Sequence, residues 1–90
     1  MNHKVVCKSS AFKHGITLGN ILHALGEPLY EGPVEVYANK YIVLGFDTTG
    51  SLLEIMYNEM EDGGLNVFHA MPCRSIFEPL LPAGIGRRNL

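Results

Sequence analysis

The strongest constraint on the fold is residues 40–71, where three short apolar runs are separated by two turn-forming clusters. The runs span residues 41–46, 52–59 and 65–71, and the clusters span residues 47–50 and 61–64. Runs rich in β-branched, aromatic and aliphatic residues, bounded by Asp, Thr and Gly, are typical of strands joined by hairpins. We therefore predict a three-stranded antiparallel meander on which the rest of the chain packs.

The clearest helix signal covers residues 18–25. Thr17 is a favourable N-cap, and Gly26 followed by Pro28 ends the helix. An apolar stripe at helical spacing is expected to face the sheet, and it consists of Leu18, Ile21, Leu22 and Leu25.

Weaker signals flank this helix and the meander. Residues 4–8 suit a short strand or an extended arm, and residues 11–14 suit one helical turn that stops at Gly15. Residues 34–38 alternate as an edge strand does, with a two-residue hairpin at Asn39 and Lys40. Residues 74–80 suit a short closing helix that docks through Ile76, Phe77 and Leu80. The predicted fold class is α+β: a small antiparallel meander of three to four strands, one or two short N-terminal helices and a short C-terminal helix.

Strand alternation divides the side chains of the meander between two faces. In the second strand, Leu53, Ile55 and Tyr57 share one face and Glu54 lies on the other. In the third strand, one face is expected to hold Leu65, Val67, His69 and Met71, and the other Asn66, Phe68 and Ala70. The predicted core is Ile21, Leu25, Val43, Leu53, Ile55 and Val67.

Length and composition bound the class of protein. Ninety residues indicate a single domain, and we expect order over about residues 4–81 with a mobile tail at 82–90. A net charge of −2 does not favour electrostatic binding of nucleic acid by the whole chain, so any RNA contact needs a local basic patch. No pattern of Cys and His has zinc spacing, so we expect neither metal nor cofactor. The absence of a long apolar stretch predicts no membrane association and a cytoplasmic location.

Two sequence elements carry a resemblance to a known family. These are the KHG element at Lys13, His14 and Gly15, and the HAM-x-x-R element from His69 to Arg74. With the ILHAL, YIVLG and LLEI segments between them, they resemble the BrnT-like toxins of bacterial type II toxin–antitoxin pairs, which are small relatives of the RelE ribonucleases. The resemblance covers about residues 9–81. It implies a RelE-like or BrnT-like fold, an RNA-cleaving activity, and neutralisation by a cognate antitoxin with which the chain can form an oligomer.

The candidate site residues are His69, Arg74, Lys13, His14 and Glu54. Metal-free RNA cleavage needs a base for the 2′-hydroxyl, an acid for the leaving 5′-oxygen and a cation for the phosphorane. Imidazole suits the proton transfers near neutral pH, and Arg and Lys suit phosphate oxygens.

Structural roles compete with these assignments. His14 and Lys13 are also compatible with a turn residue and a solvated lysine. His69 and Glu54 are compatible with a satisfied half-buried pair, and Arg74 with a surface cation. Two functions therefore stay open: a toxin that cleaves messenger RNA, and a non-catalytic interaction module that keeps the toxin fold.

Overall fold

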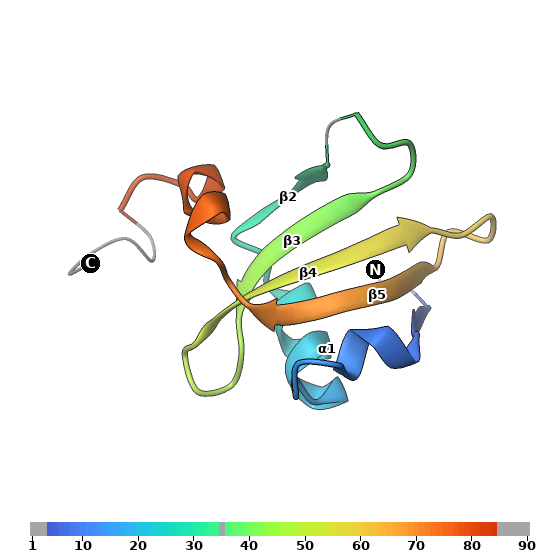
Figure 1. Ribbon diagram of the computed structural model, residues 1–90, viewed down its shortest axis with the longest axis horizontal. Helices are drawn as coiled ribbons and strands as arrows, with labels where there is room; N and C mark the ends of the chain where they lie inside the picture. The colour runs from blue at the N-terminus through green and yellow to red at the C-terminus, as the bar shows by residue number, and fades with distance from the viewer. Residues whose placement is uncertain (1–3, 35, 85–90) are drawn as a thin grey trace.

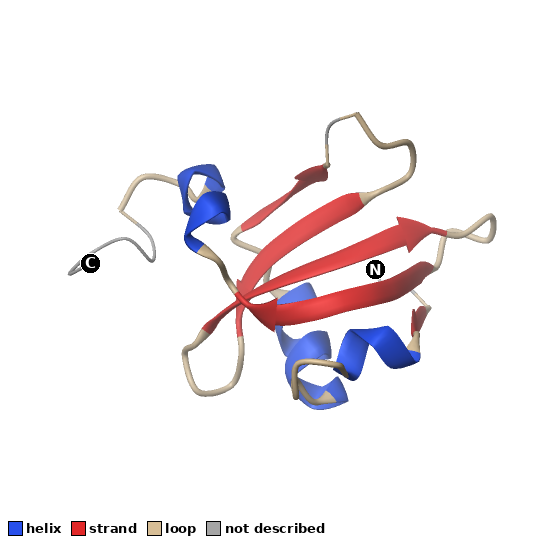
Figure 2. Cartoon of the chain, in the orientation of Figure 1, coloured by secondary structure: helices blue, strands red, loops and turns tan. Residues whose placement is uncertain are grey.

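The part of the chain that the computed structural model describes, residues 4–34 and 36–84, contains five strands and three helical segments (Figures 1 and 2). In chain order they are β1 (Val5–Cys7), η1 (Ser9–Phe12), α1 (Leu18–Gly26), β2 (Tyr30–Pro33), β3 (Tyr41–Phe46), β4 (Leu52–Glu59), β5 (Leu65–Pro72) and η2 (Ser75–Leu80), where η denotes a 3₁₀ helix. Residues 85–90 of the tail that we predicted to be mobile lie outside the described residues.

The strands form one mixed sheet in the order β1-β5-β4-β3-β2. The neighbours from β2 to β5 are antiparallel, whereas β1 pairs with β5 in parallel, Val5 opposite Leu65. The α+β class is therefore as predicted, but the sheet has five strands instead of three to four and is not purely antiparallel. The segment predicted as a strand or an arm is the edge strand β1, which pairs with a segment far away in the sequence.

The meander itself is confirmed, with β3 and β4 at the predicted bounds and β5 one residue longer. Its first turn is fixed by Asp47, whose Oδ1 accepts hydrogen bonds from the backbone N–H of Thr49 (2.8 Å) and of Ser51 (2.9 Å). Gly50 completes the turn with a φ of 89°, a conformation that side chains with a Cβ rarely adopt.

The edge strand predicted at residues 34–38 is wrong, because β2 lies earlier in the chain. The Val34 N–H donates to the Lys40 carbonyl (2.8 Å) and so closes a loop instead of a two-residue hairpin. Within this loop Val36 has a φ of 67° and Asn39 a φ of 52°. Left-handed residues interrupt the extended backbone that a strand requires.

The N-terminal helical segments lie close to their predicted positions. η1 begins two residues earlier than the turn predicted at residues 11–14, and Gly15 follows it with a φ of 83°. Thr17 caps α1 as expected, since its Oγ1 accepts a hydrogen bond from the Asn20 N–H (3.2 Å). Figure 1 shows both segments on the same side of the sheet, whereas η2 lies on the other side, next to β2.

The buried face of α1 differs from the predicted stripe. Ile21 and Ala24 are fully buried and Leu25 is half-buried, but Leu18 and Leu22 are 49% and 43% exposed. The predicted docking of Leu18 and Leu22 on the sheet is therefore wrong.

The reason lies in how closely the helix approaches β3. A Cβ atom added to Gly45 would lie 2.6 Å from the carbonyl oxygen of Ala24. Gly45 and Ala24 thus let the two backbones come together, and the helix turns its small residue toward the strand instead of Leu22.

The side chains on this face of the sheet, here called the α1 face, form the larger of two apolar clusters. Five of the six predicted core residues are buried in it, and Leu25 packs against them. The buried members of the predicted set are Ile21, Val43, Leu53, Ile55 and Val67.

The opposite face, here called the η2 face, holds the smaller cluster around Ile42 and Leu44. Phe77 and Leu81 cover it, together with Leu29 and Met56 from the loop before β2 and from β4. Of the three residues predicted to dock, only Phe77 belongs to this cluster, and the predicted docking of Ile76 and Leu80 is wrong, since their side chains are 69% and 37% exposed. A 3₁₀ helix has three residues per turn, so Phe77 faces the sheet while its neighbour faces solvent.

A β-bulge in β5 reverses the predicted faces of its second half. Tyr57 is opposite Val67 and Met56 is opposite His69, so Phe68 is the extra residue. Beyond the bulge Ala70 joins the buried residues of the α1 face, and His69 turns to the η2 face. The predicted grouping of His69 and Met71 with Leu65 and Val67 is therefore wrong, because a bulge shifts the alternation by one residue.

Candidate functional site

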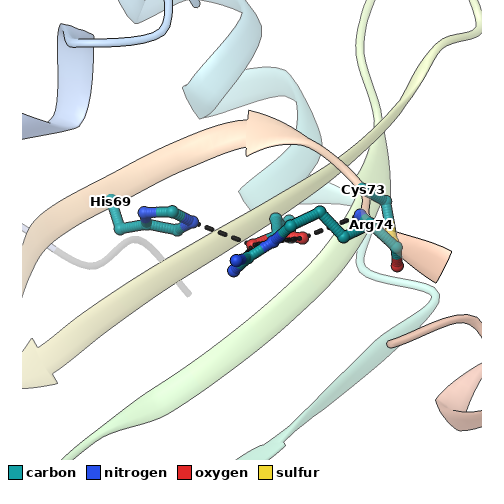
Figure 3. A network of polar contacts seen from close by, with 4 residues as sticks. His69, Cys73 and Arg74 are labelled. Carbon is teal, nitrogen blue, oxygen red and sulfur yellow. Dashed lines mark hydrogen bonds and ion pairs between the residues drawn. The ribbon is translucent and has the colours of Figure 1, made fainter. Parts of the chain in front are cut away.

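A fully buried carboxylate, Glu54 of β4, is the centre of the candidate site. Its Oε1 accepts hydrogen bonds from the backbone N–H of Arg74 (2.8 Å) and from the Arg74 Nε (3.1 Å). Its Oε2 accepts from the Arg74 Nε (3.0 Å) and Nη2 (2.5 Å) and from the His69 Nε2 (2.9 Å). Figure 3 shows the His69 ring and the Arg74 side chain directed toward each other over the sheet.

The charge of Glu54 follows from these contacts. Burial, the largest single influence, raises the pKa of the Glu54 carboxyl, but the hydrogen bonds from Arg74 and His69 and the charge of Arg74 together outweigh it and lower the pKa. The same ion pair raises the pKa of the Arg74 guanidinium. The site therefore holds a carboxylate anion against a permanent cation.

The bond to Glu54 also fixes the state of the His69 ring. An ionised carboxylate can only accept, so the Nε2 of His69 carries the hydrogen, and Nδ1 is the unprotonated nitrogen when the ring is neutral. The side chain is 21% exposed. A carboxylate that holds the far nitrogen of an imidazole orients the ring and stabilises the imidazolium, which is the arrangement that a general base requires.

The second imidazole of the site comes from the segment after η1. The rings of His14 and His69 lie edge to face, with their centroids 5.8 Å apart. β1 pairs with β5 only as far as Val67, and beyond that point the Ser10 hydroxyl donates to the Phe68 carbonyl (2.7 Å). The chain from Ser10 to His14 therefore lies beside the edge of β5 that β1 leaves free, which brings the exposed His14 to His69.

Arg74 is the cation of the site. Its side chain is 46% exposed, and its Cζ lies 5.4 Å from the centroid of the Phe77 ring. Glu54 engages the Nε and Nη2 atoms. Within residues 4–34 and 36–84, no other acceptor bonds the two hydrogens on Nη1 or the second hydrogen on Nη2.

The structure thus brings four of the five predicted residues together: His14, Glu54, His69 and Arg74. Lys13 is the exception. It is exposed, and within the described chain no hydrogen bond or ion pair joins its side chain to the other four.

The nearby thiol is in its protonated form at neutral pH. Cys73 precedes Arg74, and its Sγ donates to the Arg74 carbonyl (3.4 Å). Burial, and then the charges of Glu54 and Glu78, raise the pKa of the Cys73 thiol to about 11. The thiolate is the reactive form, so this cysteine is unreactive in its present surroundings.

Sequence reasoning missed the residues that surround the site. Phe77 was expected to dock as an apolar residue, and its ring also lies near the Arg74 guanidinium. The Lys40 Nζ lies 4.3 Å from the centroid of the Tyr37 ring and 5.6 Å from that of Phe68. No local pattern indicates these contacts, because they depend on the bulge in β5 and on the loop before β3.

Residues 4–34 and 36–84 hold no group of three or more His, Cys, Asp or Glu side chains that is arranged to bind a metal ion. No helix there has the length and apolar character needed to cross a membrane.

Comparison of the chain with family models, curated proteins and solved structures found no match.

Proposed function

We propose that this chain is a metal-independent RNA endonuclease that acts in the cytoplasm as the toxin of a type II toxin–antitoxin pair. The resemblance of the KHG and HAM-x-x-R elements to BrnT-like toxins supports the proposal. The observation that carries it is the approach of His14 to His69, whose far nitrogen is held by the buried Glu54. The two elements are distant in sequence, and each supplies one imidazole to the same site.

The proposed reaction is attack of an RNA 2′-hydroxyl on the adjacent phosphorus. The Nδ1 of His69 takes the proton of the 2′-hydroxyl while the O2′–P bond forms. The P–O5′ bond breaks, and His14 in its protonated form gives a proton to the leaving O5′. The free N–H groups of Arg74 donate to the non-bridging phosphate oxygens as charge develops there. The products are a 2′,3′-cyclic phosphate and a 5′-hydroxyl.

Glu54 acts through His69 and Arg74 in this scheme. It holds the His69 ring in one tautomer, stabilises the imidazolium formed during proton transfer, and fixes the Arg74 guanidinium beside it. Glu54 is therefore a positioning residue and not a catalytic one. In this scheme Lys13 has no part in the proton transfers, and as an exposed cation beside His14 it binds the phosphate backbone of the RNA.

A second candidate function is a non-catalytic interaction module. It is favoured by the ion pair between Arg74 and Glu54, because a purely structural ion pair would have the same geometry. It is also favoured by an apolar groove between β2 and η2, where Ile76 and Leu80 are 69% and 37% exposed.

Induced expression in a bacterium separates the two functions. We expect the wild-type chain to arrest growth and degrade messenger RNA, and co-expression of the open reading frame beside its gene to relieve both effects. His69→Ala should abolish the arrest at equal protein level. His23→Ala is the matched control, because that exposed imidazole lies on α1 and bonds the Phe46 carbonyl (2.9 Å) away from the site. Equal effects of the wild type and His69→Ala would favour the interaction module.

A further inference from the structure

We infer that Tyr37, Lys40 and Phe68 form a subsite that stacks an unpaired base of single-stranded RNA next to the cleavage site. The inference rests on the proposed function for its substrate class. The Lys40 Nζ lies 4.3 Å from the Tyr37 ring centroid and 5.6 Å from that of Phe68, so one ammonium group links two aromatic side chains. Neither ring belongs to either apolar cluster of the fold.

The bulge in β5 places this cluster beside the proposed chemistry. Phe68 is the unpaired residue of the bulge, and His69 follows it directly. Lys40 is next to β3 and Phe68 is in β5, so their side chains meet across β4 on the η2 face, the face that also carries His69 and Glu54. A strand of RNA with its phosphate at Arg74 and His69 has its neighbouring base at Phe68.

Two side-chain amides lie near Phe68, since Asn66 precedes it by two residues in β5 and Asn58 is opposite Asn66 in β4. Asn58 of β4 accepts a hydrogen bond on its Oδ1 from the Asn66 Nδ2 (3.3 Å), and both amides are only half-buried. Side-chain amides on a sheet face beside aromatic rings are suited to the edges and faces of unstacked bases, the mode by which sheets bind single-stranded RNA.

Asn39, two residues after Tyr37, is anchored to the sheet. The Asn39 side chain donates to the Glu59 carbonyl (2.9 Å) and accepts from the Glu59 N–H (2.7 Å), and Asn58 donates to the Asn39 carbonyl (2.8 Å). Val36, which is 90% exposed, is kept in the left-handed region, where a β-branched residue is strained. The Tyr37 side chain is 59% exposed, with the Lys40 ammonium group over its ring.

Lys40 has a distinct part in this subsite. Its ammonium group lies near the two rings, and we expect the same group to attract the phosphate next to a stacked base. Loss of this charge is therefore expected to weaken binding in a salt-dependent way, whereas loss of a ring is expected to remove the preference for bases.

The test is binding of two uncleavable probes to the full chain, measured by fluorescence anisotropy. One is a short single-stranded oligouridylate with 2′-O-methyl riboses, and the other has the same backbone without bases. We expect wild type to bind the first about 5- to 150-fold more tightly, the range that one stacked base gives. Phe68→Leu should abolish most of this preference, and Tyr37→Leu, a change on an exposed loop, should reduce it. Lys40→Met should lower the salt slope of binding by about one charge.

Leu22→Ala is the control, since Leu22 is exposed on α1 at the other side of the sheet. Equal affinity of wild type for the two probes, or an unchanged preference in both Phe68→Leu and Tyr37→Leu, would overturn the subsite. Because neither probe can be cleaved, the result does not depend on the proposed chemistry. A base preference that vanishes in Phe68→Leu, without any cleavage of natural RNA, would retain the subsite and overturn the proposed function.

Discussion

At the scale of single residues, Glu54 determines the character of the site. A carboxylate with no exposed surface is stable only when its oxygens are fully hydrogen-bonded, and here Arg74 and His69 supply every donor. In the described residues no buried side-chain nitrogen or oxygen lacks a partner. The same contacts that make Glu54 tolerable in the interior also fix the His69 ring, so stability and proposed chemistry depend on one side chain.

This leads to a prediction about acid stability. The pKa of Glu54 is lower in the folded chain than its ordinary value, so its contribution is complete above about pH 4.3 and is lost as the pH falls through the lower folded value. Glu54→Gln should destabilise the protein at neutral pH by about 1–3 kcal/mol, because its amide NH₂ faces donors. The Glu54→Gln protein should also lack the loss of stability that protonation of Glu54 causes in the wild type at acid pH.

Urea unfolding of both proteins between about pH 2.5 and 7 measures the effect. Glu61→Gln, which removes an exposed carboxylate of the β4–β5 hairpin, is the control. Parallel pH curves for the wild type and Glu54→Gln would show that Glu54 is not paired as described.

At the scale of elements, the sequence predicted what local patterns determine. The turn residues around Asp47 and the alternation in β4 lie within a few positions of one another, and both were correct. β1 was predicted only as a short strand or an extended arm, because its pairing partner, β5, is distant in the sequence. The faces of β5 were assigned incorrectly from His69 onward, because period-two alternation cannot reveal one inserted residue. The site shares this division: its residue types were predicted, and a His69–Glu54 pair was one of the predicted alternatives. The bulge that turns His69 to the face of Glu54 was not predicted.

The loop between β2 and β3 gives a prediction at this scale. Val36 holds a φ of 67° while its side chain is 90% exposed, so it is strained without any gain from burial. Val36→Asn should raise the free energy of unfolding by about 1 kcal/mol, because Asn tolerates the left-handed region better. Thermal unfolding checks it, with Ala38→Asn as the control at an exposed residue outside the left-handed region. A lower melting temperature for Val36→Asn would mean that the loop does not adopt this conformation.

At the scale of the whole molecule, the buried apolar residues form two clusters, one on each face of the sheet. The α1 face holds the larger cluster and the η2 face the smaller, so the second face has room for polar groups. Stability therefore depends mainly on the α1 face, and the proposed chemistry occupies the other.

Two substitutions test how the α1 face is packed. Ile55→Ala, at a fully buried position of the α1 face, should lower the free energy of unfolding by about 2–5 kcal/mol. Leu22→Ala, on the exposed side of α1, should change it by less than about 1 kcal/mol, although the sequence predicted Leu22 to be part of the packing stripe. Denaturant unfolding measures both, and a larger loss for Leu22→Ala would reverse the assigned face of the helix.

The most direct test of the central claim is the single-turnover rate at which the purified chain cleaves a single-stranded RNA in the presence of a metal chelator. We predict products that end in a 2′,3′-cyclic phosphate and a 5′-hydroxyl. We also predict a rate that rises and falls between about pH 5 and 8, because the base and the acid must hold opposite protonation states. Folded His69→Ala should be slower by about 10²–10⁴-fold, and His23→Ala unchanged. A flat pH profile together with full activity of folded His69→Ala would contradict the account.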